Sequence, residues 1–221
     1  MKSVTKPGRY SGGEYNQIIK DKNKVKARWA FCFPDSYEIG MSNLGVRILY
    51  GVLNEQEDIW CERVYTPWVD MQEKMREHGL PLTAHESKDP LTEFDIVGFT
   101  LQYEMSYTNV LNMLKLSGIP LRAADRGDEY PIIIGGGPCA YNAEPIADFF
   151  DCFSIGEGED MLVEFTKLYI KMKESGNYSK RAFLHEAAKT VGGTYVPSFY
   201  DVSYNEDNTI KAYTPVFDDI P

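Results

Sequence analysis

Five short apolar runs that alternate with helical stretches constrain the fold of this 221-residue chain more than any other feature. Such alternation favours a parallel sheet with right-handed crossovers and helices on both of its faces. We therefore predict a doubly wound α/β fold with five parallel strands in the order 2-1-3-4-5, extended by a C-terminal helix and a β-hairpin over 199–217. The predicted strands are 27–33 (ARWAFCF), 59–65 (IWCERVY), 94–101 (FDIVGFTL), 131–138 (PIIIGGGP) and 150–160 (FDCFSIGEGED).

Apolar side chains at helical spacing mark predicted helices over 44–54, 70–79, 106–118 and 161–174. In the first helix, one apolar face is formed by Leu44, Ile48 and Val52. The last helix carries a stripe typical of a core-facing helix, formed by Met161, Phe165, Leu168 and Met172. We expect these faces to pack on the sheet.

The composition is that of a folded, soluble protein, with 43% hydrophobic and 25% charged residues. The net charge of −10 disfavours a nucleic-acid partner, because phosphate binding needs a positive surface. The basic run KDKNKVKAR (20–28) alternates charged and apolar residues, which predicts the solvent-facing side of a strand. No segment has the length of a membrane span, and the N-terminus lacks the apolar core of a signal peptide. We expect a cytoplasmic protein without a membrane partner.

The spacing of cysteines and histidines indicates no metal site. The four cysteines form no C-x-x-C pair, and Cys32 and Cys152 lie in apolar runs where buried, inert thiols are expected. The histidines are scattered through charged or turn segments and are predicted to be solvent-exposed: His78, His85 and His185.

Three irregular loops at strand ends predict a ligand crevice. In open parallel sheets, ligands bind at the carboxyl ends of the strands, where the strand order reverses. With the order 2-1-3-4-5, that point lies between the first and third strands. The loops that face it are PDSYEIG (34–40), TLQYEMS (100–106) and GGGPCAYN (135–142).

The glycines in these loops have three interpretations. Gly135, Gly136 and Gly137 form either a tight turn packed on a neighbour, or the floor for a large flat ligand, or part of a dinucleotide cradle. The cradle would be G-x-G-x-x-A with Gly135, Gly137 and Ala140, and its acidic residue would be Glu157 or Glu159. The third is disfavoured because Pro138 follows at once, whereas the fingerprint requires a helix start. In IGEGED, Gly156 permits a sharp turn and Glu157 complements the positive end of the next helix.

Several motifs carry a family resemblance. PDSYEIGMSNLGVRILY resembles the corrinoid loop and first helix of cobalamin-binding domains, whose pattern is D-x-H-x-x-G. Asp35 and Gly40 match this pattern, and Tyr37 stands at the histidine position. The later elements of the family pattern are matched in part. Thr100 resembles the serine of the family's S-x-L element, but Gln102 replaces its leucine. Gly135 and Gly136 match the later Gly-Gly. More closely, GGGPCAYNAEP, IGEGED and GGTYVPSFY together resemble the N-terminal half of an uncharacterised family of radical SAM proteins with a B12-binding-like domain.

The resemblance implies a flavodoxin-like or cobalamin-binding-like domain over 26–175, preceded by an arm (1–25) and followed by a connector (176–221) toward a radical SAM domain. The C-x-x-x-C-x-x-C motif is absent, so the [4Fe–4S] cluster and S-adenosylmethionine are expected only in that partner domain. This chain alone is expected to be non-catalytic, and the substrate stays open. The implied cofactor-binding residues are Asp35, Tyr37, Gly40, Thr100, Gln102, Gly135, Gly136, Gly137, Gly156 and Glu157.

The residue at position 37 leaves the function open. A neutral phenol is a poor cobalt ligand, so either cobalamin binds without a protein axial ligand or Tyr37 fills an abandoned pocket and Asp35 is a turn residue. Three functions follow: a corrinoid-binding accessory domain, a ligand-free scaffold that docks on the catalytic domain, or a nucleotide-dependent oxidoreductase that uses the Gly135 loop.

Overall fold

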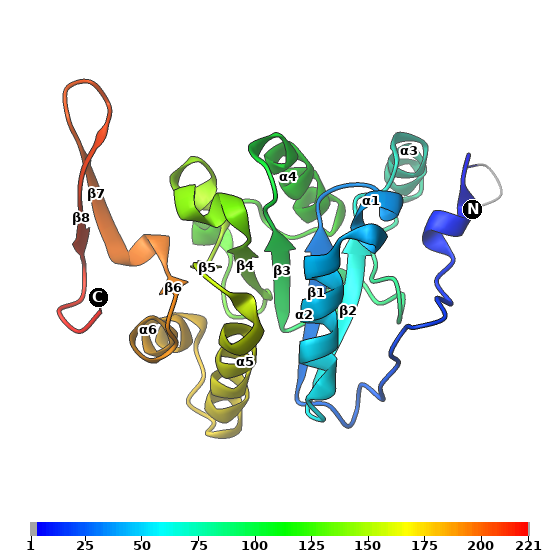
Figure 1. Ribbon diagram of the computed structural model, residues 1–221, viewed down its shortest axis with the longest axis horizontal. Helices are drawn as coiled ribbons and strands as arrows, with labels where there is room; N and C mark the ends of the chain where they lie inside the picture. Colours follow the sequence, from blue (N-terminus) through cyan, green and yellow to red (C-terminus); the bar gives the residue numbers. More distant parts are fainter. Residues whose placement is uncertain (1–3, 221) are drawn as a thin grey trace.

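The computed structural model describes residues 4–220, so residues 1–3 of the predicted arm and Pro221 of the predicted connector lie outside the described residues. A mixed sheet of six strands has the order β2-β1-β3-β4-β5-β6 (Figure 1). Its first five strands are parallel, and β6 pairs antiparallel with β5. The strands are β1 (Ala27–Phe33), β2 (Ile59–Tyr65), β3 (Ile96–Thr100), β4 (Ile132–Gly136), β5 (Cys152–Ser154) and β6 (Thr194–Tyr195).

The order of the five parallel strands is as predicted, but the sheet does not end there. We predicted five strands, and the sixth lies in the segment assigned to the connector. Its two residues, Thr194 and Tyr195, are too few to show a strand periodicity. The fifth strand is also shorter than predicted, because only 152–154 pair and the following glycine-rich turn leads directly into a helix.

Helices cover both faces of the sheet. One group of buried side chains joins the sheet to α2, α5 and α6, and a second joins its other face to α3 and α4 (Figure 1). A short helix, α1, begins within the segment 34–40, which we predicted to be a loop. The helices are α1 (Tyr37–Ser42), α2 (Leu44–Glu55), α3 (Val69–His78), α4 (Tyr107–Leu116), α5 (Gly158–Glu174) and α6 (Lys180–Thr190).

The central strand β1 shows why the apolar runs fold this way. All seven of its residues are buried, with alternate side chains packed into the two cores on opposite faces. A parallel strand covered on both faces needs this continuous apolar sequence. Trp29 links β1 to α5, because its Nε1 donates a hydrogen bond to Thr166 Oγ1 at 2.8 Å. Gly98 on β3 makes room for the indole, since a Cβ there would lie 2.8 Å from the Trp29 ring.

The buried face of α2 differs from the prediction. Val46, Tyr50 and Leu53 are buried, whereas Leu44 and Ile48 are 66% and 41% exposed. Both faces of this helix are apolar at helical spacing, so periodicity alone could not choose between them. The α5 stripe is confirmed: its first two members are buried in the core, and its last two are partly buried against it.

The predicted solvent-facing basic run is confirmed for Lys22, Lys24 and Lys26, which are exposed although they precede β1, but not for Arg28. Arg28 is only 7% exposed, and its guanidinium contacts Glu62 at 2.5 Å and Asp89 at 2.8 Å. His85, predicted to be on the surface, is 6% exposed. An edge strand is usually open to solvent, but the N-terminal arm and the segment 80–89 contact β2 through hydrogen bonds.

The C-terminal part contains the predicted hairpin. Strands β7 (Tyr200–Tyr204) and β8 (Ile210–Pro215) pair antiparallel and form a sheet of their own, on the far side of the molecule from the N-terminus (Figure 1). Over residues 4–220, none of the helices combines the length and apolar character needed to cross a bilayer.

Candidate functional site

A cleft of about 170 Å³ opens at the carboxyl edge of the sheet. Its floor is made by β1, β3, β4 and β5, and its walls by the first turns of α2 and α5. This is the place that the strand order predicts for a ligand. Six of the ten residues implied by the resemblance line it: Thr100, Gln102, Gly135, Gly136, Gly137 and Gly156.

The floor of the cleft is open because neighbouring strands carry small side chains there. Gly136 lies beside Thr100 in the register of β3 and β4. A Cβ added at Gly136 would meet nothing nearer than the Ser154 Cβ at 3.7 Å, which is ordinary contact. The Thr100 hydroxyl accepts a hydrogen bond from Gln102 Nε2 at 2.5 Å, so this polar pair is held at the cleft wall. The site therefore has a narrow apolar slot with a few polar groups.

The other two glycines of the run, Gly135 and Gly137, are required by close packing and by the backbone conformation. A Cβ at Gly135 would lie 2.8 Å from ring carbons of Phe153, so the strand packs closely against this ring. Gly137 has a φ of +95°, which side-chain-bearing residues rarely adopt. The chain then enters a 3-10 helix at Pro138 rather than an α-helix, so the helix start required by a dinucleotide fingerprint does not follow these glycines.

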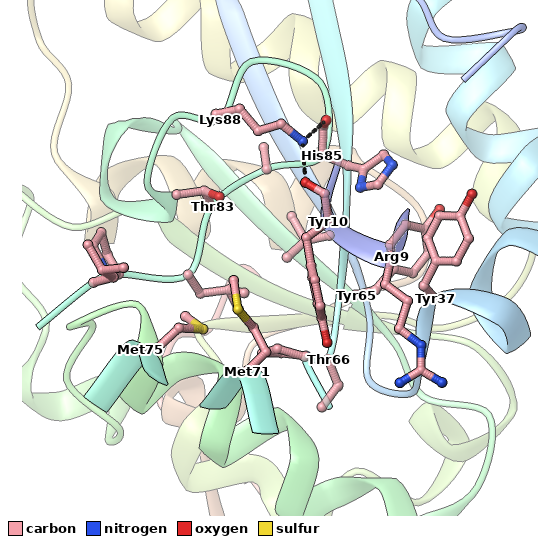
Figure 2. Close-up of a pocket in the computed structure, with 16 residues that line it drawn as sticks. Arg9, Tyr10, Tyr37, Tyr65, Thr66, Met71, Met75, Thr83, His85 and Lys88 are labelled. Carbon is pink, nitrogen blue, oxygen red and sulfur yellow. Dashed lines mark hydrogen bonds between the residues drawn. The ribbon is translucent and has the colours of Figure 1, made fainter. Parts of the chain in front are cut away.

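Tyr37 lies in a different cavity from Thr100 and the glycines. Figure 2 shows it beside Tyr65 and His85 in a cavity of about 310 Å³ that shares no lining residue with the cleft. Its hydroxyl donates to Glu14 Oε1 at 2.5 Å, and its ring lies 5.5 Å from the Tyr65 ring and 5.4 Å from the His85 ring. The phenol is therefore engaged away from the cleft.

The remaining implied residues also have local roles. The Asp35 carboxylate accepts hydrogen bonds from the backbone N–H of Ser36 at 2.6 Å and the hydroxyl of Tyr103 at 3.0 Å. Gly40 allows α1 to approach Tyr65, because a Cβ there would lie 2.5 Å from that ring. Glu157 is exposed at the start of α5.

Sequence reasoning missed the cluster formed by Glu14, Tyr37 and His85. His85 Nε2 lies 3.3 Å from Glu14 Oε1, the oxygen that also accepts from Tyr37. Burial lowers the pKa of His85, whereas the hydrogen bond from Tyr37 lowers the pKa of Glu14. Burial and Glu14 together raise the pKa of Tyr37 to about 12. Since 71 residues separate Glu14 from His85, no local spacing could have revealed their contact.

Comparison with protein families gives one match. Residues 45–197, more than half of the chain, match the family described as "Radical SAM proteins, N-terminal". The chain belongs to this family. The match begins in α2 and extends past β6, so it includes β3, β4 and β5 of the cleft floor, whereas β1 precedes it.

A curated relative of this chain is a longer protein. An uncharacterized protein of Methanocaldococcus jannaschii is 29% identical over 152 residues, which are 68% of this chain and 28% of the relative. The chain thus spans less than a third of that relative's length. No solved structure matches the chain significantly.

The histidine cluster of this radical SAM N-terminal domain predicts a specific pH dependence. Because the folded-state pKa of His85 lies below the ordinary 6.5, the unfolded chain binds the proton more readily. The free energy of unfolding should therefore be fully retained above about pH 6.5 and fall as the pH is lowered below it, by less than about 1.4 kcal/mol per pH unit. Urea unfolding of the parent and of His85→Gln would measure this.

The matched control is His78→Gln, because His78 is exposed on α3. The His85→Gln variant should lose the fall below about pH 6.5, whereas His78→Gln should keep it. Glu14 contributes in a different window, because its lowered pKa removes stability only as the pH falls below about 4.5. Identical pH profiles for the parent and His85→Gln would show that His85 does not titrate differently in the folded state.

Proposed function

We propose that this domain is a non-catalytic, corrinoid-binding accessory domain of a radical SAM enzyme. The observation that carries the proposal is the open slot at Gly136, between the first turns of α2 and α5. A slender planar group such as the nucleotide tail of cobalamin could enter there, while the corrin ring would lie above the carboxyl edge of the sheet. The resemblance of the PDSYEIG loop to corrinoid loops supports the same ligand.

The residues fit the tail better than they fit the cobalt. Gly136 leaves its side of the floor without a side chain, and Thr100 and Gln102 offer polar atoms at the wall. Tyr37, by contrast, donates to Glu14 in the other cavity, and Asp35 is bonded to Tyr103. We therefore propose binding without an axial ligand from this chain.

The roles of the chain's own residues are to bind and to orient. When bound, a corrinoid supplies cobalt-centred radical chemistry. The walls made by α2 and α5 would exclude water from the tail, and Thr100 and Gln102 would fix its orientation. The [4Fe–4S] cluster and S-adenosylmethionine belong, in this proposal, to the radical SAM domain of the parent protein, which is the domain's partner.

A second candidate function is a docking scaffold. Five large apolar side chains on segments that follow β1, β3 and β4 are between 43% and 84% exposed: Ile39, Leu44, Tyr103, Met105 and Tyr141. Such side chains at one edge favour contact with another protein surface. A radical SAM domain seated on this edge would cover them and the mouth of the cleft. A nucleotide-dependent oxidoreductase is less well supported, because a 3-10 helix follows the glycine loop.

Replacing Gly136 with valine is expected to weaken cobalamin binding at least tenfold, equivalent to about 1.4 kcal/mol. The two added methyl groups would project into the slot where the tail passes. The strand itself should tolerate them, because the space around a Cβ at this position is open. Titration of the 221-residue chain with hydroxocobalamin, followed by absorbance, measures the effect.

Gly192→Val is the matched control, since an added Cβ at this glycine meets nothing within 4 Å, and the residue lies in an exposed turn that does not line the cleft. It should bind cobalamin as the parent does. If the parent fails to bind at about millimolar cobalamin, which corresponds to about −4 kcal/mol, the corrinoid proposal is wrong. The docking scaffold would then take its place.

A further inference from the structure

The cavity that contains Tyr37 lies along the outer edge of the sheet, where β2 is covered by the N-terminal arm and the segment 80–88 (Figure 2). Its volume of about 310 Å³ is within the range of small-molecule pockets. Because it shares no lining residue with the cleft, it is independent of the corrinoid proposal.

One end of the cavity is apolar. Val64 from β2, Met75 from α3 and Leu82 are buried around it, and Met71 adds a second thioether. Methionine side chains are flexible and polarizable, so they adapt to the shape of an apolar ligand. This end is therefore suited to an aromatic or aliphatic body.

The opposite end presents the ammonium group of Lys88 (Figure 2). Its Nζ donates to the backbone oxygens of Tyr10 at 3.0 Å and His85 at 2.8 Å, which leaves one of its three N–H donors for another acceptor. The residue holds this position with a φ of +67°, a conformation that costs a side-chain-bearing residue of order 1 kcal/mol or more. Such strain is often found at functional sites.

In the described part of the chain, Lys88 lacks a carboxylate partner, whereas Arg9 and His85, which also line the cavity, each contact a glutamate. Arg9 contacts Glu38 at 2.9 Å, and Glu14 is held by Tyr37 and His85. Within residues 4–220, no carboxylate oxygen lies within 4.0 Å of Lys88 Nζ. Partial burial lowers the pKa of Lys88, with Glu86 and Glu14 acting in the opposite direction.

We propose that this cavity binds a small amphipathic organic acid. The apolar body would lie against Met71 and Met75, and the anionic group would accept a hydrogen bond from Lys88 Nζ. Tyr10 forms part of the wall, and its hydroxyl accepts from the backbone N–H of Trp68 at 3.0 Å. Arg9 and Tyr10 of the N-terminal arm therefore close one side of the proposed site.

Two dyes with the same aromatic body test the proposal. Anilinonaphthalene sulfonate carries an anionic group, and phenylnaphthylamine lacks it; both become fluorescent in apolar sites. The 221-residue chain should bind both, and the methyl resonances of Met71 and Met75 should shift in spectra of methyl-¹³C-methionine-labelled protein. Lys88→Met should weaken binding of the sulfonate at least tenfold and change binding of the uncharged dye less than about twofold.

Two further variants keep the result unambiguous. Met71→Trp, which fills the apolar end, should weaken binding of both dyes, and Lys24→Met, at an exposed lysine that does not line the cavity, should weaken neither. Thermal unfolding establishes that each variant is folded. The proposal is overturned if the Met71 and Met75 resonances do not shift, or if Lys88→Met leaves sulfonate binding unchanged or weakens both dyes equally.

Discussion

Replacing Arg63 with leucine is expected to lower the free energy of unfolding by about 3–5 kcal/mol at about pH 8. Arg63 and Glu86 form a buried pair, with side chains 3% and 0% exposed. Arg63 donates to the carboxylate from its backbone N–H and from Nε, both at 2.7 Å. Without the guanidinium, Glu86 would be a buried charge with only the backbone donor. Urea denaturation of the parent and the variant gives the difference.

The pH dependence of this variant has a defined sign. Burial already raises the pKa of Glu86 above 4.5, and the loss of Arg63 should raise it further. A carboxyl group with a raised folded-state pKa takes up a proton on folding, so its cost grows as the pH rises through that pKa. The destabilisation should therefore be smaller at about pH 5 than at about pH 8.

Two controls separate the buried pair from the loss of a surface arginine. Arg122→Leu breaks an ion pair with Asp148 whose side chains are 60% and 70% exposed, and it should cost less than about 1 kcal/mol. The double variant Arg63→Leu, Glu86→Leu should recover much of the stability lost in the single variant. A cost for Arg63→Leu no larger than that for Arg122→Leu would contradict the assignment of a buried pair.

Alanine at Gly135 should destabilise the domain by about 1–3 kcal/mol, whereas alanine at the adjacent Gly136 should change stability by less than about 1 kcal/mol. The two positions lie on opposite faces of β4. An added Cβ at Gly135 would lie 2.8 Å from the Phe153 ring and 3.1 Å from the Phe150 ring, and both rings are buried. At Gly136 the same atom would lie in the open slot.

Urea denaturation of the two alanine variants tests this difference, and the comparison is internal because the residues are neighbours in one strand. The Gly136→Ala variant is the reference for chain entropy, since both changes remove the same freedom from the unfolded chain. Equal destabilisation by the two variants would mean that the slot at Gly136 is filled in solution. That result would also weaken the proposal of a ligand there.

The sequence was sufficient for the order of the five parallel strands and for part of the cleft, but not for β6. Continuous apolar runs such as 27–33 and the helices between them predict parallel strands, and strand order then places loops at one edge. The loops that begin at Thr100 and Gly135 were found in this way, because the carboxyl ends of parallel strands lie at the same edge of a sheet, and the family resemblance then pointed to Thr100 itself. The periodicity of each segment is read directly from the sequence, and the right-handedness of the crossovers is a general rule for parallel strands. Neither requires knowledge of how distant segments pack.

The tertiary structure alone decided which side chains are buried and which cavity each one enters. The same spacing that suggested Asp35 and Tyr37 as a pair leaves their side chains bonded to Tyr103 and Glu14, in different directions. His85 is buried because the N-terminal arm returns across the edge of the sheet. The Asp35–Tyr103 contact joins residues that are 68 positions apart, and the Glu14–His85 contact joins residues that are 71 positions apart. Such contacts depend on how distant segments pack, so periodicity within one segment cannot predict them.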